Sequence, residues 1–243
     1  MVIKILIINP NSTQGMTDGL QKVVIAQADV EYSYFTNPDG PASIDDKEEC
    51  NNSAQTCMTA LLDQKHTVDL TQFDGFVVAC YSLHPLVETL KEKMGKPVVG
   101  IFEASVTTCL HLLSVSQKFG IVSTGDNWKV LLRDGVAEIL GAPNGGTKFA
   151  GVETTGRTAG ELHDDSPEQV QQLMKDATKR LLGDNGNQVG AICLGCAAMT
   201  GLRETVREAC IEQLGEEGSR IRIVDGVAAA TGIVLGLVGM SAW

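Results

Sequence analysis

Basic residues are scarce in this sequence of 243 residues. It holds 19 lysines and arginines against 30 aspartates and glutamates, so its formal net charge is -11. Nucleic-acid binding needs clustered lysine and arginine, and this balance therefore disfavours a nucleic-acid partner. Nucleotide-phosphate motifs are also missing, since neither G-x-x-x-x-G-K-[ST] nor G-x-G-x-x-G after a strand occurs.

Long apolar runs are missing as well. The most apolar segment, 226–240, is shorter than the roughly 20 residues that a membrane span needs, so we expect a buried helix and no membrane partner. The apolar run at 3–9 is not followed by a small-residue cleavage site, so no secretory signal is predicted. Seven cysteines, an odd number, are then expected to be reduced thiols in a cytoplasmic protein.

Short runs of valine, isoleucine and leucine alternate along the chain with longer helical patterns. The runs predict strands at 3–9, 30–36, 75–80, 97–101, 118–124, 149–154, 190–196 and 221–226. The helical patterns lie at 13–28, 46–66, 85–94, 103–116, 126–140, 166–182 and 200–214. This alternation predicts an α/β protein with parallel sheets. The glycine-rich stretch 141–165 is expected to be surface loop around its one strand.

Two segments that begin with a cysteine resemble each other. CYSLHPLVETLKE (80–92) and CAAMTGLRETVRE (196–208) agree at five of thirteen aligned positions. Flanking segments correspond in the same order, namely 4–13 with 118–127, 76–79 with 192–195, and 97–104 with 222–229. A duplicated α/β unit explains these matches. We predict two pseudo-symmetric, doubly wound domains, made of residues 1–101 with 216–243 and of residues 102–215.

Cys80 and Cys196 occupy the same place in the two halves, where a predicted strand ends. Ligands of open α/β sheets bind at the carboxyl ends of strands, so both thiols are expected to face one cleft between the domains. Each also precedes a predicted helix, whose dipole would favour a thiolate. Two such thiols can take a proton from one side of a carbon and return one to the other. This chemistry inverts a stereocentre without metal or cofactor.

The chain resembles the aspartate/glutamate/hydantoin racemase superfamily, and within it the hydantoin and allantoin racemase branch. The segments that carry the resemblance are NPNST (9–13), GPASI (40–44), VVACYS (77–82), PVVGIFEAS (97–105), FGIVST (119–124) and LGCAAM (194–199). The resemblance spans nearly the whole chain. It implies a cofactor-independent, two-cysteine racemase, commonly a homo-oligomer. The implied substrate is a cyclic ureide such as allantoin or a 5-substituted hydantoin.

The resemblance also assigns site residues. Cys80 and Cys196 match the two catalytic cysteines. The expected substrate-binding residues are Asn11, Ser43, Tyr81, Ser82, Ser123, Thr124, Ala197 and Ala198. No metal site is expected, because the Cys193–Cys196 pair lacks a second pair or a histidine at useful spacing. Many relatives carry an acidic residue and a glycine where this chain has Leu83, His84 and Pro85, which leaves the exact substrate open.

Other interpretations of these residues stay open. Cys80 and Cys196 could be buried small hydrophobes. His84 could line the cleft, tune the Cys80 thiol or be solvated, and Glu103 could orient the pocket or favour a helix start. The other cysteines within helical patterns are expected to be structural: Cys50, Cys57, Cys109 and Cys210.

Three other functions are also compatible with the sequence. One is an aspartate or glutamate racemase, although neither cysteine has an adjacent arginine or lysine to hold a free carboxylate. Another is an isomerase or decarboxylase in which one thiol attacks the substrate covalently. The third is a binding protein without turnover.

Overall fold

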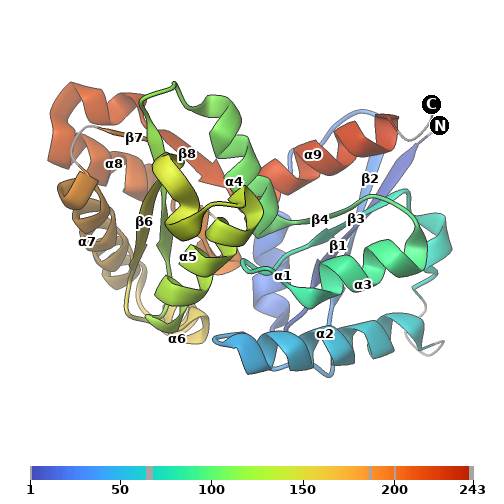
Figure 1. Cartoon of the computed structure of the whole chain (residues 1–243). Helices are drawn as coiled ribbons and strands as arrows, with labels where there is room; N and C mark the ends of the chain where they lie inside the picture. Colours follow the sequence, from blue (N-terminus) through green and yellow to red (C-terminus); the bar gives the residue numbers. More distant parts are fainter. Residues whose placement is uncertain (1, 64–67, 186–187, 200, 241–243) are drawn as a thin grey trace. The chain divides into compact units, whose positions relative to one another are not determined.

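The computed structural model describes residues 2–63, 68–185, 188–199 and 201–240 (Figure 1). Within these ranges the strands are β1 (Ile3–Asn9), β2 (Val30–Thr36), β3 (Gly75–Val78), β4 (Val98–Gly100), β5 (Lys118–Ser123), β6 (Phe149–Thr154), β7 (Val189–Gly195) and β8 (Arg222–Asp225). They form two four-stranded parallel sheets, ordered β2-β1-β3-β4 and β6-β5-β7-β8. The predicted α/β fold with parallel sheets is confirmed.

Helices connect these strands. They are α1 (Gln14–Leu20), α2 (Lys47–Leu62), α3 (Pro85–Met94), α4 (Ile101–Leu112), α5 (Asn127–Leu140), α6 (Ala159–Asp164), α7 (Pro167–Asn185), α8 (Arg203–Leu214) and α9 (Gly226–Met240). The apolar segment 226–240 forms a helix as predicted. In the part of the chain that the structure describes, no helix combines the length and apolarity needed to cross a membrane.

The chain divides into two compact units, Met1–Ala104 with Val227–Trp243, and Ser105–Gly226. Each unit holds one sheet, and both sheets follow the same order: second, first, third and fourth strand of the unit. The strand correspondence predicted from the repeat is therefore confirmed. We expected β8 to return to the first half together with α9. Instead, β8 pairs with β7, where Ile223 lies buried beside Ile192, and α9 returns alone.

The first sheet is covered on both faces (Figure 1). One face packs against α2 and α3 through Leu6, Ile8, Phe76, Val78 and Val98. On the other face α9 approaches β3 closely. A Cβ atom on Gly75 would lie only 2.8 Å from Cγ2 of Val234, so glycine is what allows this approach.

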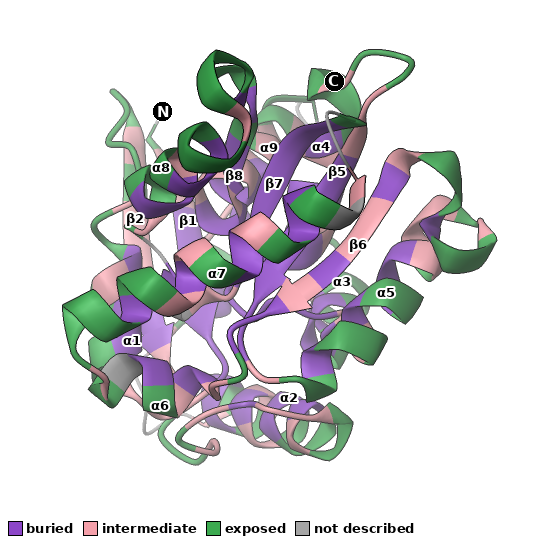
Figure 2. Ribbon diagram, turned by 90° about the vertical axis from the view of Figure 1, so that its left-hand side faces the viewer, coloured by how far each residue is buried: buried purple, intermediate pink, exposed green. Residues whose placement is uncertain are grey.

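The second sheet repeats this arrangement. One face packs against α7 and α8, with Val122, Ile192, Leu194 and Ile223 in the shared core. Figure 2 shows β7 buried along its length behind α7. On the other face, Cys193 of β7 contacts Cys109 of α4, with their sulfur atoms 3.3 Å apart. The hydrogen bond with Cys193, together with burial, raises the pKa of the Cys109 thiol, so Cys109 stays protonated within the core.

Candidate functional site

Cys80 and Cys196 follow corresponding strands of the two sheets. Cys80 comes shortly after β3 ends at Val78, and Cys196 comes directly after β7 ends at Gly195. Each of these strands pairs with the first and the fourth strand of its own unit. Each thiol therefore lies at the carboxyl end of an inner strand, which is where parallel α/β sheets bind their ligands.

Neither thiol lies at the N-terminus of an α-helix, contrary to the expectation. His84, not Cys80, is the N-cap residue of α3. Cys196 is followed by a short 3₁₀ turn at Ala197–Met199, and α8 begins only at Arg203. Because a helix dipole acts within about one turn of the helix end, it is not what would activate these thiols.

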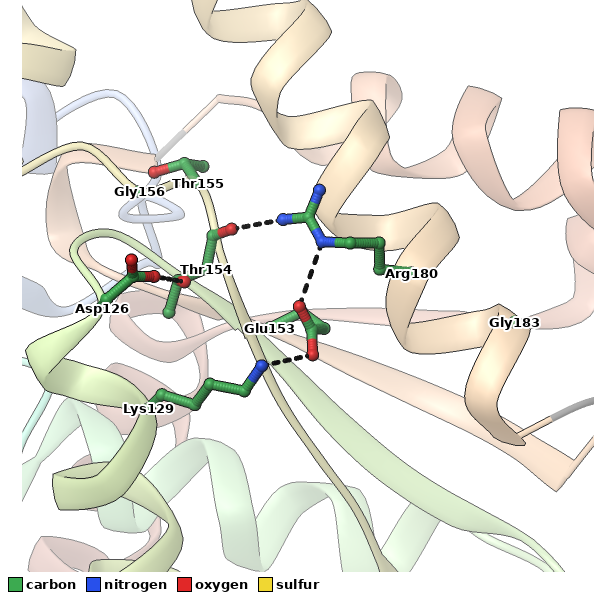
Figure 3. A pocket seen from close by; sticks show the side chains of 8 residues that line it. All are labelled: Asp126, Lys129, Glu153, Thr154, Thr155, Gly156, Arg180 and Gly183. Carbon is green, nitrogen blue, oxygen red and sulfur yellow. Dashed lines mark hydrogen bonds and ion pairs between the residues drawn. The ribbon is translucent and has the colours of Figure 1, made fainter.

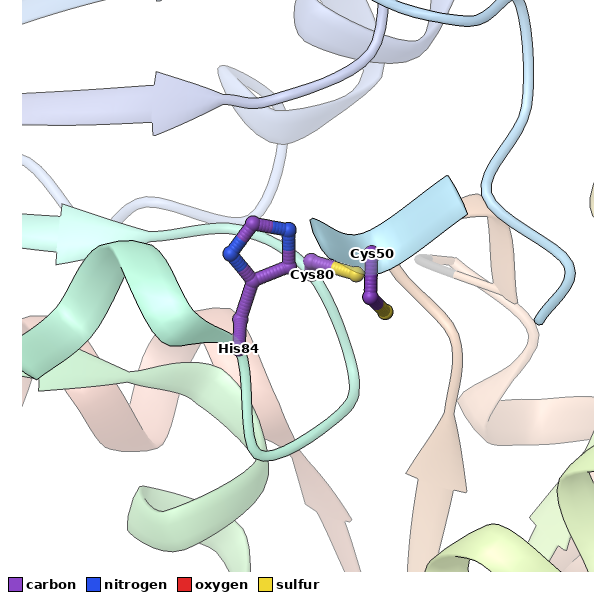
Figure 4. A group of neighbouring side chains, drawn as sticks. All are labelled: Cys50, Cys80 and His84. Atoms are coloured by element: carbon purple, nitrogen blue, oxygen red, sulfur yellow. The ribbon is translucent and has the colours of Figure 1, made fainter. Parts of the chain in front are cut away.

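Cys80 lies in a cluster with Cys50 of α2 (Figure 4). The Cys50 and Cys80 sulfur atoms are each 3.5 Å from Oγ of Ser82. A hydrogen bond with Cys80 lowers the pKa of the Cys50 thiol, against the opposing effects of burial and of the Asp46 and Glu49 carboxylates. Cys50, which was expected to be structural, thus lies beside a candidate catalytic thiol.

His84 is buried, and its surroundings determine where its proton lies. Its Nδ1 accepts a hydrogen bond from the Leu86 amide at 3.3 Å. Burial lowers the pKa of His84 to about 4, so at neutral pH the ring carries one proton, which must be on Nε2. Nε2 lies 2.9 Å from Oγ of Ser53 and donates to it, and Ser53 in turn donates to the Cys50 carbonyl at 2.9 Å.

These bonds decide between the roles considered for His84. The side chain is not solvated, and neither ring nitrogen is free to take a proton from Cys80. The Cys50, Cys80 and His84 ligand atoms lie within 4.8 Å of one another, which is close enough for a metal site. However, both His84 nitrogens are already engaged, and two thiols fall short of the four ligands that zinc usually takes. The donor set therefore does not fit a zinc site.

The residue before Cys196 is hydrogen-bonded to the end of β5. The buried Ser123 hydroxyl donates to the Gly195 carbonyl at 2.7 Å, one residue before the thiol. A Cβ atom on Gly195 would lie 2.8 Å from the Val122 carbonyl oxygen, so only glycine permits this close packing. The Ser123 hydroxyl, predicted to bind substrate, donates its hydrogen within the protein instead.

The other predicted binding residues of this unit are Thr124, Ala197 and Ala198. Thr124 is buried, and its carbonyl accepts hydrogen bonds from the Thr155 hydroxyl and the Gly156 amide. Ala197 and Ala198 form the 3₁₀ turn directly after Cys196. The binding role predicted for their backbone amides stays a prediction.

The remaining predicted residues lie in the first unit. The side-chain oxygen of Asn11 accepts from the Thr13 amide and from the Asn9 side chain, and the Ser43 hydroxyl donates to Asp45 at 2.5 Å. Both side chains are thus occupied within their own turns. Tyr81 is buried with its ring edge-on to Phe102, at a centroid distance of 5.2 Å. The structure places Ser82 beside Cys80; its amide donates to the Cys80 carbonyl, and its hydroxyl is hydrogen-bonded with the Cys50 and Cys80 sulfur atoms.

A separate polar hollow of about 560 Å³ lies on the second unit (Figure 3). It is lined by Asp126, Lys129, Glu153, Thr154, Thr155, Gly156, Arg180 and Gly183. Its two cations are engaged, because Glu153 pairs with Lys129 at 2.7 Å and with Arg180 at 3.1 Å. None of the site residues predicted from the sequence lines this hollow. We therefore do not place the candidate chemistry there.

Comparisons with known proteins agree with the resemblance seen in the sequence. The family model described as Asp/Glu/Hydantoin racemase matches residues 5–234. An uncharacterized protein of Schizosaccharomyces pombe is 35% identical over 99% of this chain and 94% of its own length. A hydantoin racemase of a Pseudomonas species is 26% identical over 93% and 82% of the two chains. The crystal structure of allantoin racemase from Pseudomonas fluorescens matches with a TM-score of 0.79 and 26% identity, over 98% and 92% of the two chains.

Proposed function

Because the chain belongs to the Asp/Glu/hydantoin racemase family, we propose that it interconverts the enantiomers of allantoin or of a 5-substituted hydantoin without a cofactor. The observation that carries this proposal is the repeated placement of Cys80 and Cys196, each after the third strand of its own unit. The relatives named as hydantoin racemase and allantoin racemase support the choice of a cyclic ureide substrate.

The proposed reaction moves protons only. One cysteine, as thiolate, removes the hydrogen from C5 of the ring, and the electron pair of the C–H bond passes to the adjacent carbonyl. The other cysteine, as thiol, delivers its proton to the opposite face of C5. One sulfur gains a proton and the other loses one, so no electrons are transferred and the roles reverse for the other enantiomer. Cysteine suits both roles, because its reference pKa of about 8.5 can be brought close to neutrality.

Proton exchange tests this proposal. Racemic allantoin in D2O is followed by proton NMR, and single enantiomers by circular dichroism, with wild type, Cys80→Ser and Cys196→Ser. The wild type should replace the C5 hydrogen by deuterium and erase the optical signal. Each variant should lose racemisation by about 10²–10⁴-fold while retaining exchange with one enantiomer, because one face keeps its base. Cys57→Ser, which changes a buried thiol in the core of the same unit, is the matched control and should keep its activity.

Other outcomes identify the alternatives. If allantoin does not exchange, alkyl and aryl hydantoins are tested next, followed by aspartate and glutamate. If only one cysteine is indispensable and a substrate adduct on it can be trapped by mass spectrometry, covalent catalysis replaces two-base racemisation. Absence of exchange with every substrate would refute the racemase proposal.

A further inference from the structure

The second thiol beside Cys80 has no role in the reaction proposed above. Cys50 comes from the first turn of α2, far from Cys80 in the sequence. Its side chain is almost completely buried, with 5% of its surface exposed, and Cys80 is 9% exposed. The two sulfur atoms are within 4.8 Å of each other and share Ser82 as a hydrogen-bond partner at 3.5 Å.

Burial alone makes a thiolate costly. Cys57 shows this on the same helix, since burial there raises the pKa of the thiol to about 12. A hydrogen-bond donor to the charged form has the opposite effect. The Cys50 thiol and the Ser82 hydroxyl lie close enough to Cys80 to act as such donors once Cys80 is charged. A pair of bonded thiols therefore loses its first proton more readily than a lone buried thiol does.

The charges around the pair influence which sulfur becomes negative. Asp46 lies just before the first turn of α2 and Glu49 lies within it, and both carboxylates disfavour a negative charge on Cys50. His84 is neutral and bonded to Ser53, so it brings no positive charge that would offset the effect of these carboxylates on Cys50. The hydrogen bond with Cys80 outweighs these carboxylates and lowers the pKa of the Cys50 thiol, so the two thiols share one negative charge, and the carboxylates shift that charge toward Cys80.

We propose that Cys50 is a positioning residue for Cys80, with which it shares a proton through a thiol–thiol hydrogen bond supported by Ser82. When Cys80 gives its proton to the substrate carbanion, the Cys50 thiol donates a hydrogen bond to the new thiolate. When Cys80 takes a proton from carbon, that hydrogen bond is released again. No proton leaves the pair other than the one transferred to substrate. This inference rests on the proposed catalytic function of Cys80.

The pH dependence of Cys80 alkylation tests the inference without any substrate. Trypsin releases residues 66–91 as a peptide in which Cys80 is the sole cysteine, so mass spectrometry reads its modification separately from that of Cys50. Initial rates with limiting iodoacetamide are measured against pH for wild type, Cys50→Ala, Cys50→Ser and Cys57→Ala. The last variant is the matched control, because it removes another buried thiol of α2.

We expect Cys50→Ala to move the alkylation midpoint of Cys80 upward by about one pH unit, which slows its alkylation at neutral pH about tenfold. Cys50→Ser keeps a donor and should restore more than half of this shift. Cys57→Ala should leave the midpoint unchanged. If Cys50→Ala and Cys57→Ala give the same midpoint as wild type, Cys50 is a packing residue only and the inference is wrong.

Kinetics separate this inference from the racemase proposal. For the enantiomer that needs Cys80 as base, the pH profile of kcat/KM should shift upward in Cys50→Ala by the same amount as the alkylation midpoint, with KM nearly unchanged. A wild type without activity on any substrate would refute the racemase proposal, while the alkylation midpoints would still decide whether the two thiols share a proton. A shift in KM alone would count against the positioning role.

Discussion

At the scale of the residue, His84 joins two elements near the candidate thiol. Its Nδ1 caps the first turn of α3, while its Nε2 bonds to Ser53 of α2. The two bonds require a neutral ring, because a protonated Nδ1 could not accept from the Leu86 amide. Protonation of His84 would therefore break the link between α3 and α2.

This makes stability depend on pH. Burial lowers the pKa of His84 from 6.5 to about 4, so below pH 6.5 the unfolded chain binds a proton that the folded chain does not. The contribution of the neutral His84 ring to the free energy of unfolding is complete above pH 6.5. About 3 kcal/mol of it is lost as the pH falls to 4. Urea unfolding at pH 7, 5.5 and 4.5 should show wild type losing more stability than His84→Asn, which keeps a cap acceptor but does not titrate. A constant difference between the two proteins would contradict this assignment.

Glu103 acts in the opposite direction over part of this range. Burial raises the pKa of its carboxyl group to about 6, so the folded chain binds a proton more readily than the unfolded chain. Its burial penalty is therefore greatest above pH 6 and disappears as the pH falls below about 4.5. Because wild type and His84→Asn both contain Glu103, its effect cancels in their difference.

The sequence identifies some of the site residues and not others. Cys80 and Cys196 stand out because the repeat aligns them. Cys50 does not, because its role depends on which face of α2 meets the end of β3, and apolar periodicity alone does not specify that contact. The link between His84 and Ser53 is hidden for the same reason, since it joins residues of separate elements.

At the scale of the element, the contact of α9 with β3 depends on the missing side chain of Gly75. A Cβ atom there would lie 2.8 Å from Val234 and 3.2 Å from Ile5. Gly75→Ala should therefore destabilise the protein by about 1–3 kcal/mol through overpacking. In combination with Val234→Ala, which makes room, the loss should be smaller than the sum of the two single losses. Chemical denaturation of the four proteins measures this coupling, and strictly additive losses would show that α9 does not pack as described.

Most elements could be predicted because the buried strands are nearly continuous apolar runs. The short helix α6 was not, since it lies in a stretch rich in turn residues. A local signal was present, however, because Thr158 and Glu161 form a capping box at its start. The end of α1 was also predicted too late, at 28 instead of Leu20. The pairing of β8 with β7 could not be predicted from the sequence of β8 itself, because any buried parallel strand has the same apolar pattern.

At the scale of the whole molecule, a substitution in the core of one compact unit should destabilise that unit more than the other. Val234 of α9 and Val206 of α8 are both fully buried, but they belong to different units. Replacing either with alanine should cost about 2 kcal/mol. In hydrogen exchange, Val234→Ala should weaken protection of β1 and β3 more than of β5 and β7, and Val206→Ala should do the reverse. Equal loss of protection in both sheets would show that the chain opens as a single cooperative unit.

The return of α9 to the first sheet also reverses the usual order of folding during synthesis. All strands of the first sheet leave the ribosome early, yet α9, which packs on β3, is translated after every element of the second unit. Domains near the N-terminus generally fold first as a chain emerges. Here the second unit has all its strands and helices before α9 is made. The N-terminal half therefore gains this helix, and the cover that it gives to β3, only after the later half is complete.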